Sequence, residues 1–330
     1  MAKYYYSVYG LYIEQYLEVQ KNLGYRPKER NYFLVAFDRL AMERDEAVVG
    51  ISKELADEWG KKNMNESEIN RYKRIQSVRL FALFLCKMGY PSYNAQLPKL
   101  QTTFTPYIFT AEQILAFFIV CDHLDIRTSN KSMVFIIPAL FRVLYATGIR
   151  ISEALSLKCQ DVNLQESYLI VRNSKNGMDR IVPISDSLTK VCKEYSEYRN
   201  RYSKLICNMS DCFFVNTDGS VCNLATVYNW FRKILHEVGI SHGGRGIGPR
   251  VHDLRHTFVC HSLAEMAEKG LDLYYSLPVL STYLGHRSLA ATDGYIRLTA
   301  QMYPDIAVKI NGLASDLFPD ILNLDDYEAN

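Results

Sequence analysis

The sequence lacks the features that would place it in several common classes of protein. None of its apolar runs reaches the roughly 18 to 20 residues that a membrane-spanning helix needs. Its first residues, MAKYYYSVYGLYIEQYLEV, do not have the basic-then-apolar order of a secretion signal. The glycine-rich stretch SHGGRGIGPR lacks the Lys-Ser or Lys-Thr ending of a phosphate-binding P-loop, so we assign it no nucleotide. These absences predict a cytoplasmic protein that has no membrane partner.

The cysteines do not form a pattern that predicts disulfides or a metal site. There are eight, with no C-x-x-C pair, at positions 86, 121, 159, 192, 207, 212, 222 and 260. Cys207, Cys212 and Cys222 lie closest together, but their spacing fits no common zinc motif. His236 is poorly placed to complete one. We therefore predict reduced, mostly buried thiols and no bound metal.

The net charge of the chain says little about its function. The net charge is +2, whereas many DNA-binding domains are strongly basic. Residues 311–330 carry five acidic and no basic side chains, so the first 310 residues carry a net charge of +7. The bulk of the chain is thus moderately basic, and an acidic tail follows it.

Residues 1–105 are predicted to form an all-helical domain. Apolar residues recur at helical spacing over 5–22, 28–44, 52–63 and 67–88. The last segment ends before Gly89, which suits a helix C-cap. It also carries the basic residues Arg71, Lys73, Arg74 and Arg79. They either form an ordinary solvated helix face or lie along a phosphate backbone.

A second domain is predicted over residues 106–310, after a proline-rich linker at 90–107. Thr110 is placed to cap its first helix, with Gln113 at the capping-box position. Helical periodicity covers 134–147, 187–205, 223–238, 253–268 and 276–284. Two β-rich segments, 168–172 and 180–184, flank an Asn-Gly turn signal and predict a hairpin. The predicted fold is mainly α with a small antiparallel β-sheet.

Five short stretches of the second domain carry residues that suit phosphate chemistry. Taken singly, each has an ordinary explanation: a solvated arginine, a solubilising lysine on a turn, a chance H-x-x-R, a cap histidine and one tyrosine among 24. The stretches are YATGIRISEALSLK with Arg150, SKNGMDR with Lys175, PRVHDLRHTF with His252 and Arg255, LSTYLGHRS with His286, and AATDGYIRL with Tyr295.

The combination of these side chains points to phosphoryl transfer. Arginine is a fixed fork that matches phosphate oxygens and keeps its charge, so two arginines can stabilise a pentacoordinate transition state. A tyrosine oxygen can attack phosphorus once its proton is removed. Lysine can protonate a leaving oxygen, and histidines transfer protons near neutral pH. The set needs no metal and no other cofactor.

In these motifs the chain resembles the tyrosine recombinase (phage integrase) family, most closely from about Phe109 to Tyr295. The resemblance implies that Arg150 and Arg255 hold the scissile phosphate. It implies that Glu153 orients the site, and that Lys175 protonates the leaving 5′ oxygen. The hairpin reads SKNGMDR rather than the commoner Gly-Lys-Gly form, which makes the lysine match the loosest of the set.

The resemblance also assigns the remaining three residues. His252 would be the acid–base partner of the tyrosine, and His286 would donate a hydrogen bond to the phosphate. Tyr295 would be the nucleophile that forms a 3′-phosphotyrosine. The N-terminal domain would be the family's helical core-DNA-binding (SAM-like) domain.

The resemblance implies double-stranded DNA as the substrate and self-assembly into a synaptic tetramer, with no small-molecule substrate. An accessory directionality factor is a further candidate partner, and the protein would associate with a bacterial-type nucleoid. Residues 311–330 would dock onto a neighbouring protomer, or else fold back on their own domain. Since helical periodicity begins almost at residue 4, the three-domain layout of some phage integrases is not expected.

Several biological roles fit this family resemblance. A mobile-element integrase or transposase acting through a Holliday junction is the preferred reading. The alternatives are a Xer-like resolvase, an invertase, a type IB topoisomerase and, as a different class, a non-catalytic DNA-binding regulator.

Overall fold

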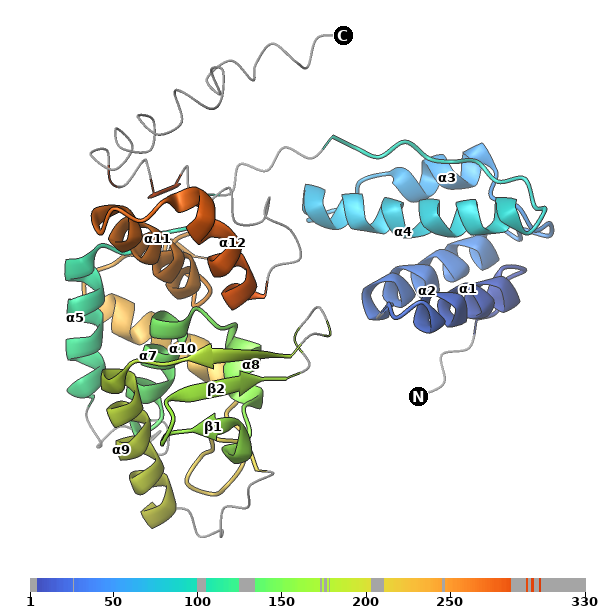
Figure 1. Cartoon of the computed structure of the whole chain (residues 1–330). Coiled ribbons are helices and arrows are strands. Elements are labelled where there is room, and N and C mark those ends of the chain that lie inside the picture. Colours follow the sequence, from blue (N-terminus) through green and yellow to red (C-terminus); the bar gives the residue numbers. More distant parts are fainter. Residues whose placement is uncertain are drawn as a thin grey trace. The chain divides into compact units, whose positions relative to one another are not determined.

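The computed structural model divides the chain into two compact units, residues 1–104 and 105–330 (Figure 1). It describes residues 5–25, 27–99, 105–124, 134–172, 174, 177, 179–202, 211–244, 247–285, 295, 298, 299 and 303. No helix in these ranges is long and apolar enough to cross a membrane. Each unit has its own hydrophobic core.

Unit 1 is a helical domain. Its elements are α1 (Gly10–Asn22), α2 (Lys28–Glu43), α3 (Lys53–Gly60) and α4 (Glu68–Lys87). Ser52 and Ser67 cap α3 and α4 by accepting hydrogen bonds from backbone N–H groups of the first turn. After α4 the chain turns at Gly89 with φ +91°, as the sequence predicts. Phe37 and Phe81 are fully buried where the apolar faces meet.

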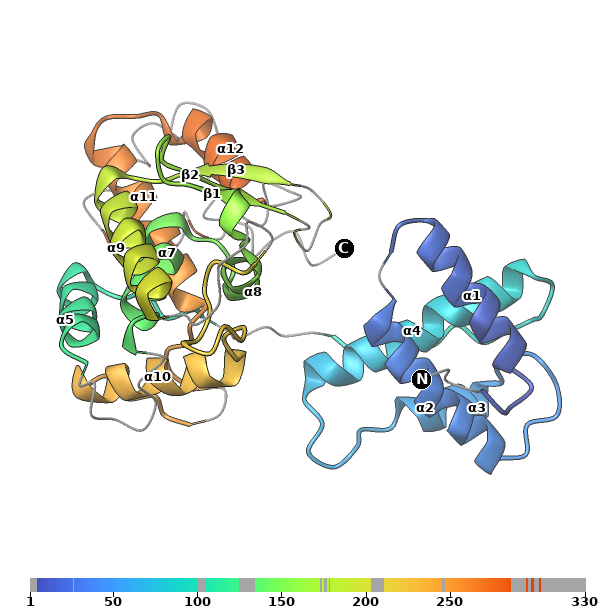
Figure 2. The same ribbon diagram turned by 90° about the horizontal axis from the view of Figure 1, so that it is seen from below.

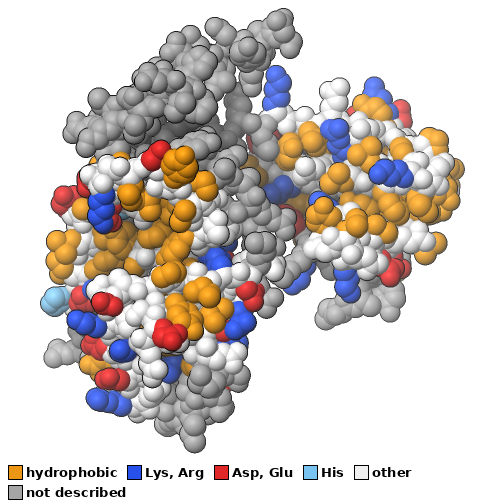
Figure 3. Space-filling model, viewed as in Figure 1, with side chains coloured by type: hydrophobic (Ala, Val, Ile, Leu, Met, Phe, Trp, Pro, Cys, Tyr) orange, Lys and Arg blue, Asp and Glu red, His pale blue; other side chains and the backbone are white. Residues whose placement is uncertain are grey.

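Side chains on the surface of unit 1 are mixed in character. Figure 3 shows Lys and Arg scattered among hydrophobic side chains on the face that it presents. No single basic stripe marks the visible face as the one that would meet DNA.

Unit 2 combines helices with a small sheet. Its elements are α5 (Ala111–Asp122), α7 (Ile137–Thr147), α8 (Ile151–Ser156), the 3₁₀ turn η1 (Cys159–Asp161), β1 (Val162–Asn163), β2 (Tyr168–Val171), β3 (Arg180–Pro183), α9 (Asp186–Tyr202), α10 (Leu224–Glu237), α11 (Asp253–Glu268) and α12 (Leu273–Leu284). The predicted capping box of Thr110 and Gln113 is present at α5. Helix α7 contacts α5, α8, α9 and α11 and so lies in the middle of the unit (Figure 2).

The sheet is antiparallel, in the order β1-β2-β3. Leu169 pairs with Val182, and both are buried. The predicted hairpin is confirmed, with each strand one residue shorter than its apolar segment. The two-residue strand β1 was not predicted, because two residues are too short to show a period. The mainly helical class with a small antiparallel sheet is confirmed.

The turn between α7 and α8 brings four elements together. Gly148 ends α7 with φ +60°, a conformation that favours glycine. A Cβ at this position would lie 2.5 Å from Cδ1 of Phe258 on α11 and 3.1 Å from Cδ2 of Leu284 on α12. This close packing sets the N-terminus of α8 beside α11 and the end of α12.

Candidate active site

Glu153 holds two arginines at the start of α8. One carboxylate oxygen accepts a hydrogen bond from Nη1 of Arg150 at 2.8 Å, and the other accepts one from Nη2 of Arg180 at 2.8 Å. The second oxygen also accepts the backbone N–H of Arg150 at 2.9 Å. Burial alone would raise the pKa of Glu153, but the hydrogen bonds from Arg180 and Arg150 lower it to about 2. The carboxylate therefore stays charged and fixes the direction of both guanidinium groups.

Arg180 was not among the predicted site residues. It begins β3, and its Nε donates to the carbonyl of Tyr283 near the end of α12 at 2.9 Å. Its side chain thus links the base of the hairpin, α8 and α12. In the sequence, Arg180 is marked only by its place directly after the hairpin turn, in RIVPI. An arginine at the start of a strand is ordinary, so this place did not single it out.

Among the charged residues of the predicted set that the structure describes, Arg255 is the most deeply buried, at 2% exposure. It lies in the first turn of α11 and donates to the carbonyls of Gly148 at 2.6 Å and Leu284 at 2.8 Å. Burial, followed by the charge of Arg150, lowers its pKa to about 10. The guanidinium therefore remains charged at neutral pH. The carbonyls of Gly148 and Leu284 hold it in place.

His252 occupies the N-cap position of α11, without a side-chain capping hydrogen bond, and is partly buried. Burial, together with the charges of Arg255 and Arg150, lowers its pKa to about 4. At neutral pH this imidazole is therefore uncharged.

Tyr295 is buried, at 7% exposure, against the core formed by α11 and α12. Burial raises the pKa of its phenol, whereas the charges of Arg255 and Arg150 act in the opposite sense. Its hydroxyl lies 2.7 Å from Nδ1 of His256, one residue after Arg255. The sequence displays this histidine in HDLRHTF, but the H-x-x-R spacing directed attention to His252 alone.

Arg255 donates to the carbonyl of Gly148, two residues before Arg150. The rings of His252 and His256 meet, and His256 contacts Tyr295, so the structure brings Arg150, His252, Arg255 and Tyr295 into one region of unit 2. Two other predicted site residues, Lys175 and His286, lie outside the described residues, as does the tail at 311–330. Among described side chains, no group of three or more His, Cys, Asp or Glu could hold a metal ion.

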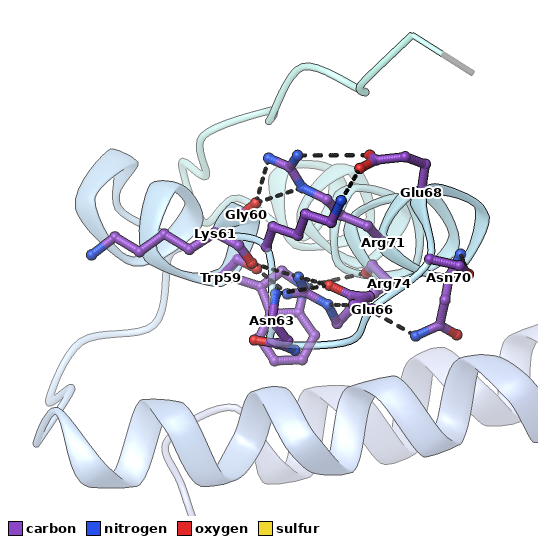
Figure 4. Close-up of polar contacts among 11 residues, drawn as sticks. Trp59, Gly60, Lys61, Asn63, Glu66, Glu68, Asn70, Arg71 and Arg74 are labelled. Carbon is purple, nitrogen blue, oxygen red and sulfur yellow. Dashed lines mark hydrogen bonds and ion pairs between the residues drawn. The ribbon is translucent and has the colours of Figure 1, made fainter. Parts of the chain in front are cut away.

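The basic residues of α4 divide into two kinds, and Figure 4 shows the first, Arg71 and Arg74. Arg74 is buried, and its guanidinium donates to both oxygens of Glu66 at 2.8 Å and to the carbonyl of Lys61 at 2.7 Å. Arg71 donates to the carbonyl of Gly60 at 3.0 and 2.9 Å. Both arginines thus fasten the loop between α3 and α4.

Lys73 and Arg79 keep solvent-exposed surface, although Lys73 pairs with Glu29 at 2.7 Å. These two side chains therefore remain candidates for contact with a DNA phosphate. Burial leaves Arg74 no surface for a phosphate, and Arg71 would first have to leave its carbonyl partner.

Comparison with known proteins gives one consistent family. A sequence profile described as "Phage integrase family" matches residues 108–302. The chain is 26% identical over 294 residues to y4rB of Sinorhizobium fredii, a protein described as an integrase/recombinase, and the match covers 88% of this chain and 93% of that protein. It is 32% identical over 169 residues to the tyrosine recombinase XerA of Pyrococcus furiosus, covering 51% of this chain and 52% of XerA.

Solved structures share the fold at low sequence identity. The Tn1549 transposon integrase in complex with transposon right end DNA matches with a TM-score of 0.62 at 17% identity, covering 88% of this chain and 94% of that one. The XerH site-specific recombinase bound to palindromic difH substrate matches with a TM-score of 0.61 at 19% identity, covering 80% and 73%.

Proposed function

The chain belongs to the phage integrase family of tyrosine recombinases, and on this basis we propose that it cuts and rejoins DNA at specific sites through a covalent bond to Tyr295. The observation that carries the proposal is the surrounding of one tyrosine hydroxyl. Arg150 and Arg255, which come from different elements, both act electrostatically on Tyr295. Two fixed positive charges beside a buried phenol suit attack on a phosphodiester.

The proposed reaction begins with attack of the Tyr295 oxygen on the scissile phosphorus. A 3′-phosphotyrosine forms and a 5′-hydroxyl leaves, so the bond energy is retained and neither ATP nor another cofactor is consumed. Arg150 and Arg255 bind the non-bridging oxygens and stabilise the charge of the transition state. Lys175 protonates the leaving oxygen, while His286 and the uncharged His252 donate hydrogen bonds to the phosphate.

Double-stranded DNA is the proposed substrate. The two structural neighbours are described as DNA complexes, which supports the same class of ligand for this chain. Unit 2 would carry the chemistry, and unit 1 would grip the duplex with Lys73 and Arg79 of α4 among its phosphate contacts. Strand exchange between two duplexes would need four protomers, with residues 311–330 docking onto a neighbour.

Two biological roles have specific support. Similarity to y4rB and to the fold of a transposon integrase favours an integrase or transposase of a mobile element. Similarity to XerA favours a Xer-like resolvase. Sequencing the DNA that becomes covalently attached to the protein in its source cells separates them: element ends support the first role, and one fixed chromosomal site supports the second.

Replacement of Tyr295 by Phe tests the chemistry directly. Wild-type protein is incubated with nicked suicide duplexes made from such recovered sequences and run on a denaturing gel. We expect a covalent protein–DNA band that disappears in Tyr295→Phe, although the variant still binds the duplex. Tight binding without any covalent band in wild type would instead favour a non-catalytic regulator.

A further inference from the structure

Two histidines flank Arg255 on α11, and their surroundings differ. His252 lies three residues before the arginine, and His256 lies directly after it. The two rings meet edge to face, with centroids 4.8 Å apart. His256 contacts the nucleophile: its Nδ1 lies 2.7 Å from the Tyr295 hydroxyl. That distance is a normal hydrogen bond involving an O–H group.

We propose that His256, rather than His252, is the catalytic residue that accepts the phenolic proton of Tyr295 as the bond to phosphorus forms. The proposal rests on the proposed recombinase function and assigns one proton transfer within it. Its basis is direct contact, because a general base must lie within hydrogen-bond reach of the proton that it removes.

The charges around the two histidines favour the same assignment. Nε2 of His256 lies 3.9 Å from Oδ1 of Asp253, which is 1% exposed. Asp253 is itself held by the backbone N–H of Arg250 at 2.8 Å. A carboxylate on the far side of an imidazole stabilises the imidazolium that proton transfer creates.

The neighbours of His252 act in the opposite sense. Burial and then three arginines, Arg255, Arg150 and Arg250, disfavour its protonation and lower its pKa, although Glu153 acts against them. A second proton on His252 would add positive charge to a cationic region. His252 is therefore suited to donate a hydrogen bond to a phosphate and poorly suited to take a proton from a phenol.

The proton and electron pairs balance in the following step. The Tyr295 oxygen forms the P–O bond while its proton moves to Nδ1 of His256. The bond from phosphorus to the 5′ oxygen breaks, and that oxygen receives a proton from the general acid, for which Lys175 is proposed. In the resealing step, a 5′-hydroxyl attacks phosphorus and gives its proton back to the general acid that lost one in the first step. The bond from phosphorus to the Tyr295 oxygen breaks, and His256 returns its proton to that oxygen.

The first test separates hydrogen bonding from proton transfer. Asparagine places an amide oxygen near the position of Nδ1, so His256→Asn keeps an acceptor but cannot take the proton. We expect this variant to bind the suicide duplex like wild type and to form covalent complex at least about 100-fold more slowly, the lower range for loss of a general base.

Helix α11 offers a matched control. Nδ1 of His261 lies 2.9 Å from the hydroxyl of Tyr145, and its Nε2 lies 3.0 Å from the carbonyl of Phe109. His261→Asn therefore makes the same change at a second histidine–tyrosine contact of the same helix, away from the nucleophile. It is expected to form covalent complex at close to the wild-type rate, so any general damage from altering α11 would be detected.

The second test asks whether the defect concerns the proton. A fluorinated tyrosine introduced at position 295 has a more acidic phenol and depends less on a base. It is expected to restore at least about tenfold of the rate that His256→Asn loses, and to change the rate of the His261→Asn protein little. A substrate with sulfur at the 5′-bridging position needs no protonation of its leaving group. It should rescue Lys175→Ala but leave the His256→Asn defect in place.

Three results would overturn the assignment. They are a His256→Asn rate within about threefold of wild type, a slow rate that fluorotyrosine does not improve, and rescue of His256→Asn by the 5′-sulfur substrate. The last two would make His256 a positioning residue or a partner of the leaving group. If wild-type protein forms no covalent complex at all, the recombinase proposal fails on its own, and that result is distinct from any of these three.

Discussion

At the residue scale, Glu153 determines how two arginines are presented. Its carboxylate is 5% exposed at the side chain and meets Arg150 and Arg180, one from each flank. Removing one partner of a buried ion pair is costly, because the other charges stay buried without compensation. Glu153 therefore stabilises unit 2 and also orients Arg150, the arginine that is proposed to bind the phosphate.

Glu153→Gln is expected to lower the free energy of unfolding at pH 7 by about 3 kcal/mol, the equivalent of a pKa held near 2 instead of 4.5. Because the folded-state pKa is depressed, this contribution is present above pH 4.5 and is lost as the pH falls towards 2. Urea unfolding of both proteins at pH 7, 4 and 3 should show the difference shrinking with acidity.

The control for this substitution is an exposed ion pair. Glu265 and Lys269 lie on the surface of α11, each with 64% of its side chain exposed. Glu265→Gln should change stability little at any of these pH values, since exposed pairs contribute little. A Glu153→Gln difference that is the same at pH 7 and pH 3 would refute the electrostatic origin.

At the scale of elements, the basic residues of α4 serve two purposes: some stabilise unit 1, and others are candidates for binding DNA. Arg74 and Glu66 are almost fully buried as a pair, and the Arg74 guanidinium also lies 4.9 Å from the ring of Trp59. Lys73, the preceding residue, pairs with Glu29 in solvent. Adjacent residues of one helix thus have opposite environments.

Arg74→Ala is expected to destabilise unit 1 by about 3 kcal/mol, because it leaves the Glu66 carboxylate buried and unpaired. Lys73→Ala should alter stability by less than about 0.5 kcal/mol and weaken DNA binding, with a shallower salt dependence. Trp59 fluorescence in a Trp230→Phe background reports the unfolding of unit 1 alone, since the chain has two tryptophans. Equal stability losses in the two variants would contradict this division.

At the scale of the whole molecule, assembly on DNA is proposed to depend on the tail at 311–330. This segment alternates acidic residues with apolar ones, and it lies outside the described residues. Apolar side chains that dock onto a neighbouring protomer would stabilise the assembly most where four protomers meet on two duplexes.

Truncation after residue 311 is expected to leave covalent attachment to a single duplex intact and to prevent stable tetramers on DNA. Analytical ultracentrifugation of the protein–duplex complex measures the assembly, and the suicide-duplex gel measures attachment. A full-length variant with Leu317, Phe318 and Ile321 replaced by serine keeps the acidic charge and should behave like the truncation. Ordered tetramers of the truncated protein would exclude docking by the tail.

The sequence by itself determined the class of the fold and most of its elements. Period-3.6 apolar patterns located the helices of both units, and two β-rich segments around an Asn-Gly turn located β2 and β3. These signals are local, because the spacing of apolar residues reflects which side of a helix or strand faces a core. The capping box at Thr110 and the turn at Gly89 are equally local. Sequence motifs also named Arg150, His252, Arg255 and Tyr295 as one set.

Only the tertiary structure decided which other side chains surround that set and which of them contact one another. Arg180 joins Glu153 because β3 packs beside α8 and α12, and no spacing in the sequence states that contact. His256 meets Tyr295 across 39 residues, although the H-x-x-R spacing had singled out His252. Arg74 is buried, although the sequence of α4 places it among other basic residues with nothing to distinguish it from them. Hydrogen bonds and burial depend on neighbours distant in the chain, and local periodicity does not encode those neighbours.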